Sequence, residues 1–163
     1  MNLPPEISTA LLAALPLTEL RAAIPLAIGL YKMSSVSALS WALIGNCLAA
    51  LAVIWLIGPV TALAGIYLPW LKRLLDWIFV RTRNQNLDKY LKYGQWALVI
   101  FVAIPLPGTG AWTGALIAFL FGLTKWKSWL LICLGVLIAG VLVTLITQGI
   151  IQGFNFILDL PMN

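Results

Sequence analysis

The amino-acid sequence predicts an all-α integral membrane protein: an inverted repeat of a re-entrant helical hairpin plus a transmembrane helix, with an amphipathic helix on the cytoplasmic side. Composition gives the membrane class, because 62% of the residues are hydrophobic, only 9% are charged and the mean hydropathy is +1.01. A soluble domain carries charge on about a quarter of its residues. The hairpins follow from two apolar stretches that proline and glycine interrupt, and the transmembrane helices from two uninterrupted apolar runs.

The interruption is clearest in residues 95–123. Their centre reads Pro105-Leu106-Pro107-Gly108-Thr109-Gly110, which cannot continue an α-helix because proline lacks an N–H and glycine favours open backbone. The arms, Trp96–Ile104 and Ala111–Leu123, each reach roughly half of a ~30 Å hydrocarbon core. Non-helical backbone at membrane depth survives only where protein buries it or where it lines a cavity. We therefore expect a re-entrant hairpin whose tip lies near the midplane.

Residues 7–31 form the other interrupted stretch. Two charges and two prolines lie near its centre: Pro16, Glu19, Arg21 and Pro25. Charged residues at mid-depth usually face an interior or a water-filled cavity, so we expect a second re-entrant hairpin with arms Ile7–Leu15 and Leu20–Tyr31. The alternative is one kinked spanning helix with a Glu19–Arg21 contact. Residues two apart point to different sides of a helix, which disfavours that pairing.

Two uninterrupted runs, residues 38–57 and 129–147, are predicted to cross the membrane. The first is expected to end at Gly58-Pro59, and its Gly45-x-x-x-Ala49 spacing of small residues permits close helix packing. Residues 60–68 either extend this helix or lie at the interface. Asn46, the one strongly polar residue in the first run, is expected to hydrogen-bond to a neighbouring helix or to line the substrate path.

A basic amphipathic stretch separates the two repeats. In Pro69–Arg83, apolar residues recur at helical spacing with charges between them, as in a helix lying on the membrane surface. The chain therefore divides into a first repeat (residues 1–68), a linker (69–94) and a second repeat (95–163). Similar short segments begin at Gly29 and Gly122, at the same place in the two repeats. This pattern matches the inverted-repeat design of secondary transporters.

Positive charge orients the chain in the bilayer. Most of the ten Lys and Arg residues fall in segment 72–92 or in the turn 124–128. Both segments lie on one face if each hairpin returns to its side of entry and each long helix crosses once. The positive-inside rule makes that face cytoplasmic and places both termini on the opposite side. The net charge of +5 is thus a topology signal, and no nucleic-acid partner is expected.

The tips of two opposed hairpins would meet near the bilayer midplane, which is the predicted substrate site. Half-helices leaving the tips present N-terminal N–H groups that attract anions, and the guanidinium of Arg21 suits phosphate or carboxylate. Glu19 is either a proton carrier or a structural partner of Arg21. The predicted substrate-binding residues are Glu19, Arg21, Pro25, Asn46, Pro105, Pro107, Gly108, Thr109, Gly110 and Thr113.

The composition argues against an enzyme. The chain has no histidine, and its five acidic residues are scattered, so a metal site or a histidine-based catalytic centre is hard to build. No catalytic residue, metal or cofactor is expected. Cys47 and Cys133 lie in apolar runs and are interpreted as small core residues, without a disulfide or metal role.

Two segments carry a family resemblance, Pro16 to Pro25 (PLTELRAAIP) and Ile104 to Gly114 (IPLPGTGAWTG). They resemble the signature segments of the small multi-drug export protein family, and the likeness covers nearly the whole chain. That family is similar to the DedA (SNARE-associated/VTT-domain) superfamily, whose members have opposed re-entrant hairpins. The resemblance implies a multi-pass protein of a prokaryotic plasma (inner) membrane. DedA proteins typically carry charges in both hairpins, whereas here the second hairpin has none.

The resemblance and the residues leave three functions to weigh. The DedA likeness implies a translocase of a phosphorylated lipid such as undecaprenyl phosphate, with the head group on Arg21 and proton exchange at Glu19. The family name implies export, here of amphipathic cations, with Glu19 as the counter-charge. In a membrane scaffold the hairpins would be purely structural. We expect the anion translocase, because Arg21 and the positive helix ends outweigh one acid, and a homo-oligomer, most simply a dimer, in contact with membrane lipids.

Overall fold

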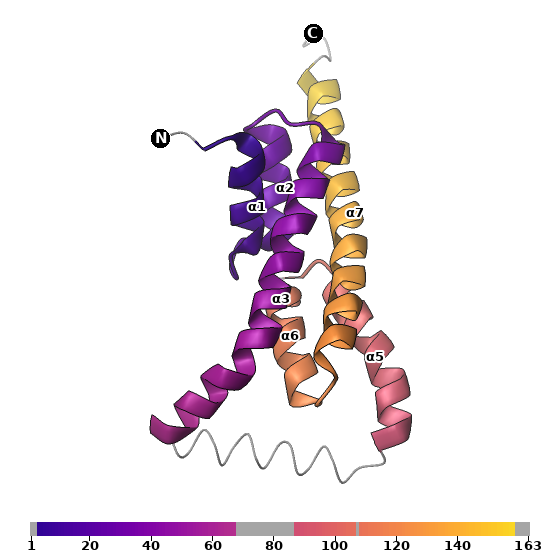
Figure 1. Ribbon diagram of the computed structural model, residues 1–163. Coiled ribbons are helices and arrows are strands. Elements are labelled where there is room, and N and C mark those ends of the chain that lie inside the picture. The colour runs from indigo at the N-terminus through magenta and orange to yellow at the C-terminus, as the bar shows by residue number, and fades with distance from the viewer. Residues whose placement is uncertain (1–2, 68–86, 107, 159–163) are drawn as a thin grey trace.

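Six helices form the part of the chain that the structure, a computed structural model, describes, namely residues 3–67, 87–106 and 108–158 (Figure 1). In chain order they are α1 (Pro5–Ala14), α2 (Glu19–Gly29), α3 (Ser35–Tyr67), α5 (Leu87–Ala103), α6 (Ala111–Leu120) and α7 (Lys125–Leu158). Two shorter helices precede a long one in each half of the chain. The predicted all-α class is confirmed for these residues, whereas the predicted amphipathic helix 69–83 lies outside them.

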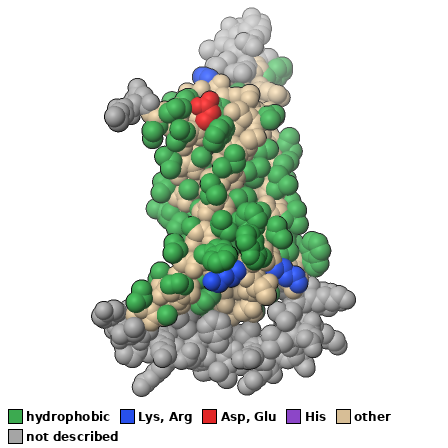
Figure 2. Space-filling model, in the orientation of Figure 1, with side chains coloured by type: hydrophobic (Ala, Val, Ile, Leu, Met, Phe, Trp, Pro, Cys, Tyr) green, Lys and Arg blue, Asp and Glu red, His purple; other side chains and the backbone are tan. Residues whose placement is uncertain are grey.

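The two long helices, α3 and α7, run antiparallel side by side (Figure 1). The amide of Gln148 donates to the hydroxyl of Ser35 at 2.6 Å, and the indole N–H of Trp129 donates to the carbonyl of Cys47 at 3.0 Å. Both helices contain a segment long and apolar enough to cross a membrane, Ser35–Leu63 and Lys125–Phe154. The outer surface around them is largely apolar (Figure 2), as expected where lipid is the solvent.

α3 is longer than its predicted span because it continues through Gly58-Pro59 to Tyr67. The predicted end at residue 57 is therefore wrong, and residues 60–67 extend the helix. Pro59 removes one N–H from the hydrogen-bond ladder, but its fixed φ is compatible with a helix. The hydroxyl of Thr61 lies 2.8 and 2.9 Å from the carbonyls of Ile57 and Gly58. These are back-bonds of a helical threonine to its own helix, whereas the carbonyl that Pro59 leaves without a donor is that of Trp55, four residues earlier.

α7 also exceeds its predicted span of 129–147. It begins at Lys125 and ends at Leu158, so most of the predicted turn 124–128 is the first turn of the helix. The N–H of Ser128 bonds to the carbonyl of Thr124 at 2.9 Å, which starts the ladder. Hydropathy placed the boundary too late because it marks where the chain becomes apolar and not where helical hydrogen bonding begins.

α1 and α2 form an antiparallel pair joined by a turn at residues 15–18 (Figure 1). The hydroxyl of Thr18 donates back to the carbonyl of Leu12, which closes the turn. α1 packs closely on α3: a Cβ added at Gly45 would lie 2.0 Å from the carbonyl oxygen of Ala10. The predicted close packing at Gly45 is confirmed, and it is a backbone-to-backbone contact.

α5 and α6 form the corresponding pair in the second half, joined by a tip at residues 104–110. α5 has 17 residues, so the predicted nine-residue arm Trp96–Ile104 is too short, whereas α6 has 10 residues and is short as expected. The basic residues 89 and 92, which the sequence analysis assigned to the linker 69–94, belong to α5. α5 packs on α7, where a Cβ at Gly135 would lie 2.9 Å from the carbonyl oxygen of Val99.

The core lies where the two helix pairs meet the long helices. Its largest fully buried apolar side chains come from α2, α5 and α7: Ile24, Val102, Ile132 and Val136. Gly140 of α7 adds a close approach, since its Cβ would lie 2.7 Å from Leu39 of α3. This packing brings the α1–α2 turn and the α5–α6 tip together beside the middle of α3 and α7 (Figure 1).

Candidate functional site

The two tips are joined by Arg21. Its Nη2 donates a hydrogen bond of 2.9 Å to the hydroxyl of Thr109 and a longer one of 3.4 Å to the carbonyl of Ile104. Arg21 lies in the first turn of α2, and both partners belong to the opposite tip. The predicted meeting of Arg21 with the Gly108-Thr109-Gly110 tip is therefore present in the structure.

The tip is shaped to present Thr109. Gly108 has φ +84°, a left-handed conformation that glycine adopts without a steric penalty. The backbone N–H of Thr109 bonds to the carbonyl of Leu106 at 3.2 Å. Its hydroxyl lies 2.7 and 2.8 Å from the carbonyls of Ile104 and Leu106. A hydroxyl that donates to one of these carbonyls keeps its lone pairs for the guanidinium.

Glu19 occupies the N-terminus of α6. Its side chain is 9% exposed, and its carboxylate packs against the bare Cα of Gly110, where a Cβ would lie 1.6 Å from Oε2. The carboxylate faces the backbone N–H groups of Ala111 and Trp112 at the start of α6. These N–H groups carry the positive end of the helix dipole. The half-helix end predicted to bind a substrate anion is therefore filled by the protein's own carboxylate.

Glu19 and Arg21 also form an ion pair, with 4.0 Å between Oε2 and Nη2. Residues two apart on a regular helix would point to different sides, and the prediction therefore disfavoured this contact. Glu19, however, has φ +45°, a left-handed conformation that costs a non-glycine residue roughly 1–2 kcal/mol. The backbone turn at Glu19 changes the direction of its side chain, which makes the contact possible. Strain of this kind often marks a functional position.

Trp112 joins the two tips in the opposite direction from Arg21, with the donor on the second hairpin and the acceptor on the first. Its indole N–H donates to the carbonyl of Ala14, at the end of α1, at 3.1 Å. The sequence analysis did not single out this residue. A signal was available, since a tryptophan N–H away from water needs an acceptor and α1 must end with unpaired carbonyls.

Arg21 retains unused hydrogen-bonding capacity. Its Nε is buried and has no hydrogen-bond partner among the described residues, while its side chain remains 17% exposed. Pro25 lies four residues after Arg21 within α2 and, lacking an N–H, leaves the carbonyl of Arg21 without its usual helical donor. The site thus offers one N–H donor and one carbonyl beside a partly exposed cation.

Asn46 lies in α3 and is fully buried. Neither polar atom of its side-chain amide has a hydrogen-bond partner in the described part of the chain, so the predicted bond to a neighbouring helix is not formed there. Helical register puts Asn46 on the same strip of α3 as Leu39 and Leu43, which approach Gly140 of α7. Asn46 therefore faces the interior of the helix bundle. It makes no hydrogen bond with Glu19, Arg21 or Thr109 in the described part of the chain.

The remaining predicted residues are distributed around the tip. Pro105 and Gly108 belong to the irregular segment between α5 and α6, and Thr113 is half-buried in the first turn of α6. Pro107 lies outside the described residues. The structure thus brings Glu19, Arg21, Thr109 and Gly110 into direct contact, and it leaves Pro25, Pro105, Gly108 and Thr113 as neighbours in the chain.

Both cysteines are free, as the sequence analysis assumed. Cys47 of α3 and Cys133 of α7 are half-buried, and their thiols are close neighbours. Within the described ranges, the structure holds no cluster of three His, Cys, Asp or Glu residues that could bind a metal ion.

Comparison with known proteins gives one family. A family model described as "Putative small multi-drug export protein" matches residues 19–142, a segment that runs from the start of α2 into α7 and contains the Arg21 cluster. Neither the curated proteins nor the solved structures yield a match.

Proposed function

Because the chain belongs to this small multi-drug export family, we propose that it is a membrane transporter whose substrate is an amphipathic anion bound at Arg21. Family membership and the two long apolar helices support the coarser part, a membrane transporter. The proposal that the substrate is an anion rests on the chemistry of the tip cluster, by which we mean Glu19, Arg21, Thr109 and Gly110.

The proposed arrangement in the bilayer is an inverted repeat. α3 and α7 cross the membrane in opposite directions, and each short pair enters and leaves on one side as a re-entrant hairpin. Lys125 and Lys127, at the start of α7, lie on the cytoplasmic face by the positive-inside rule. Such a design puts broken helices at the midplane, where secondary transporters bind their substrates. A dimer would supply the bulk to seal the path.

The unpaired Nε of Arg21 is the observation that carries the anion proposal. A buried N–H donor without a partner costs on the order of 1–3 kcal/mol, and a phosphate or carboxylate oxygen would satisfy it. The existing contacts of Nη2 with Ile104 and Glu19, at 3.4 and 4.0 Å, are long. An anion could replace both with shorter, charge-assisted bonds.

Glu19 is proposed to make this exchange reversible. When ionised, it faces Arg21 and the N–H groups of Ala111 and Trp112. When it takes up a proton, its hold on both weakens, and the guanidinium and the α6 N-terminus become free for the substrate anion. Release of the proton would restore the ion pair and expel the substrate. Anion movement is thereby coupled to proton movement.

The proposed substrate class is a phosphorylated polyprenyl lipid such as undecaprenyl phosphate. A lipid-linked anion keeps its chain in the bilayer while only the head group must reach the tips. The described surface around α3 and α7 is apolar along its length (Figure 2), which suits a substrate that stays in contact with lipid. A small site with one guanidinium suits one phosphate group.

An exporter of amphipathic cations is the second candidate, and the family description supports its export part. Glu19 would be its counter-charge. The geometry disfavours it, because the carboxylate is nearly buried and already faces two N–H groups and Arg21. A cation would have to displace all of these contacts.

The test is binding by the purified protein. Three ligands are compared: a polyprenyl phosphate, the corresponding polyprenol, and a lipophilic cation. The variants are Arg21→Gln, Glu19→Gln and, as a matched control away from the tips, Lys127→Gln. We expect phosphate-selective binding that falls at least about tenfold in Arg21→Gln and is unchanged in Lys127→Gln.

Folding is monitored by the melting temperature of each variant. Binding of the cation alone, lost in Glu19→Gln, would replace the anion proposal with the exporter. If the wild type binds none of the three ligands while Arg21→Gln and Glu19→Gln both unfold, the tip cluster is structural and the chain is a scaffold.

A further inference from the structure

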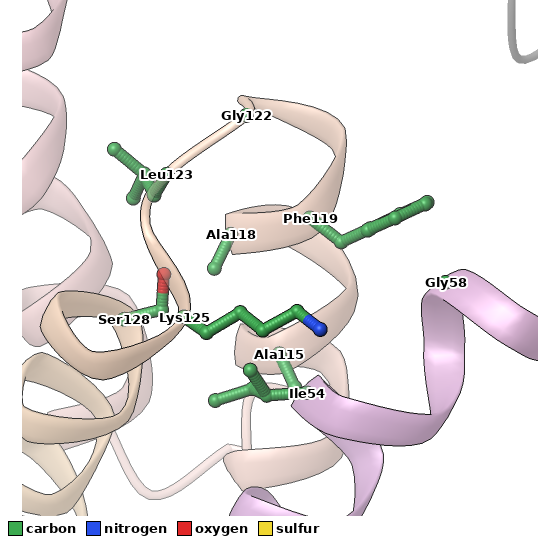
Figure 3. A pocket seen from close by; sticks show the side chains of 9 residues that line it. All are labelled: Ile54, Gly58, Ala115, Ala118, Phe119, Gly122, Leu123, Lys125 and Ser128. Carbon is green, nitrogen blue, oxygen red and sulfur yellow. The ribbon is translucent and has the colours of Figure 1, made fainter.

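A second site lies at the other end of α6. The structure has a cavity of about 200 Å³ between α3, α6 and the start of α7 (Figure 3). Small and apolar side chains form its walls, among them Ile54, Ala115, Ala118 and Leu123. Its lining on α6 begins at Ala115, about 6 Å along the helix from Ala111, and none of its lining residues belongs to the group Glu19, Arg21, Thr109 and Gly110. It is therefore separate from the proposed transport site.

Lys125 gives this cavity its charge. Its aliphatic stem crosses the cavity, and its ammonium group ends on the side of α3 (Figure 3). The ammonium lies 4.7 Å from the centre of the Trp55 ring, within range for a cation–π contact. Of the acidic side chains that the structure describes, Glu19 contacts Arg21 at the tips and Glu6 lies in α1.

The surrounding residues are those of a membrane interface. Trp126 packs edge-to-face on Trp55 and on Trp129, with ring centres 6.1 and 5.8 Å apart. Tryptophan and lysine gather where the hydrocarbon region meets the head groups. Figure 2 shows basic side chains at the lower edge of the apolar belt. The cavity thus opens at the depth where lipid phosphates lie.

We propose that this cavity binds an anionic phospholipid, with its phosphate on Lys125 and a segment of one acyl chain against Ile54, Ala115 and Ala118. The charge of Lys125 selects the anion. The apolar walls select the chain, since they offer nothing to inorganic phosphate. One water occupies about 30 Å³ in the liquid, and a methylene group is of similar size. A cavity of about 200 Å³ therefore has room for a short run of methylene groups and not for a whole lipid.

Bound there, the lipid would hold α3 and α6 together at the cytoplasmic end, where Ile54 of α3 and Ala115 and Ala118 of α6 line the same cavity. This lipid is a fixed component of the protein and not its cargo. The proposal therefore does not depend on the substrate proposed for Arg21, and Arg21→Gln must leave lipid binding here unchanged.

The experiment is native mass spectrometry of the delipidated full-length protein. It is titrated with phosphatidylglycerol, with phosphatidylcholine of the same chains, and with inorganic phosphate or glycerol phosphate as competitors. The wild type should retain phosphatidylglycerol in preference to phosphatidylcholine. Lys125→Gln should lose this preference about tenfold, the size expected for one charge-assisted contact. Lys127→Gln, at an exposed neighbouring lysine, should keep it.

A second variant tests the acyl slot. Ala118→Leu projects a larger side chain into the cavity and should reduce binding of both lipids, whereas Ala52→Leu, at an exposed position of α3, should not. Equal lipid preference in Lys125→Gln and Lys127→Gln overturns the proposal. So does full displacement of the lipid by glycerol phosphate or inorganic phosphate, which would make this a free-phosphate site.

Discussion

Arg21 and Thr109 lie 88 positions apart in the sequence, and a hydrogen bond of 2.9 Å joins the guanidinium of one to the hydroxyl of the other. Trp112 and Ala14 repeat this link in the opposite direction, at 3.1 Å. The turn of the first helix pair and the tip of the second thus hold each other through polar contacts, surrounded by apolar helices.

The Arg21–Thr109 bond should be measurable as a coupling energy. We expect a double-mutant cycle with Arg21→Met and Thr109→Val to give an interaction of about 1–3 kcal/mol, because the bond is charge-assisted and mostly shielded from water. The measurement is the unfolding free energy in detergent. The cycle Arg21→Met with Thr61→Val is the control, since Thr61 bonds within α3; equal couplings in the two cycles would contradict the contact.

Gly110→Ala should expel the Glu19 carboxylate from the α6 N-terminus. The new Cβ would lie 1.6 Å from Oε2, and the side chain of Glu19 is the part that can move. We expect a loss of about 1–3 kcal/mol in unfolding free energy together with weaker binding at the tips. Gly29→Ala is the control, because its Cβ meets open space. If both variants behave like the wild type, Glu19 does not occupy this position.

Gly45→Val should be among the most damaging substitutions in the chain. The added Cβ meets the carbonyl oxygen of Ala10 at 2.0 Å, and no side-chain rotation relieves a clash with backbone. We expect a loss of more than about 3 kcal/mol in unfolding free energy. Gly149→Ala, in open space on α7, should instead gain up to about 1 kcal/mol from helix propensity. A tolerated Gly45→Val would mean that α1 does not pack on α3.

The two native cysteines report on the packing of α3 against α7. Because the thiols of Cys47 and Cys133 are close neighbours, a short bifunctional thiol reagent should link them within one chain. Intact-mass and peptide mass spectrometry distinguish this product from two separate adducts. Cys47→Ser should give a single adduct on Cys133. Two separate adducts in the wild type would place the thiols far apart.

The broken helices of the fold were the most predictable part of the structure. Proline and glycine act on their own backbone, so Pro16 and the residues around Gly108 mark the interruptions directly. Helix ends were less predictable. The sequence of α3 signals a stop at Gly58-Pro59, yet the helix continues to Tyr67, because the fixed φ of proline is compatible with a helix and only one hydrogen bond is lost.

The sequence predicted which residues form the candidate site, but it did not predict which contacts they make with one another. Glu19 and Arg21 stand out because charge is rare in an apolar stretch, and Thr109 because it is the hydroxyl of the tip. That Glu19 fills the α6 N-terminus depends on the left-handed φ of one residue and on the bare face of Gly110. Neither is visible in a pattern, because both result from how the two tips fit together.

The ion pair at the tips has a consequence for motion. Glu19 and Arg21 belong to the same turn of α2, yet one contacts the N-terminus of α6 and the other contacts Thr109 in the tip before it. Neither contact can open by a displacement of α2 that leaves the other in place. Separation of the two halves as rigid bodies would therefore break both contacts together and expose both charges at once.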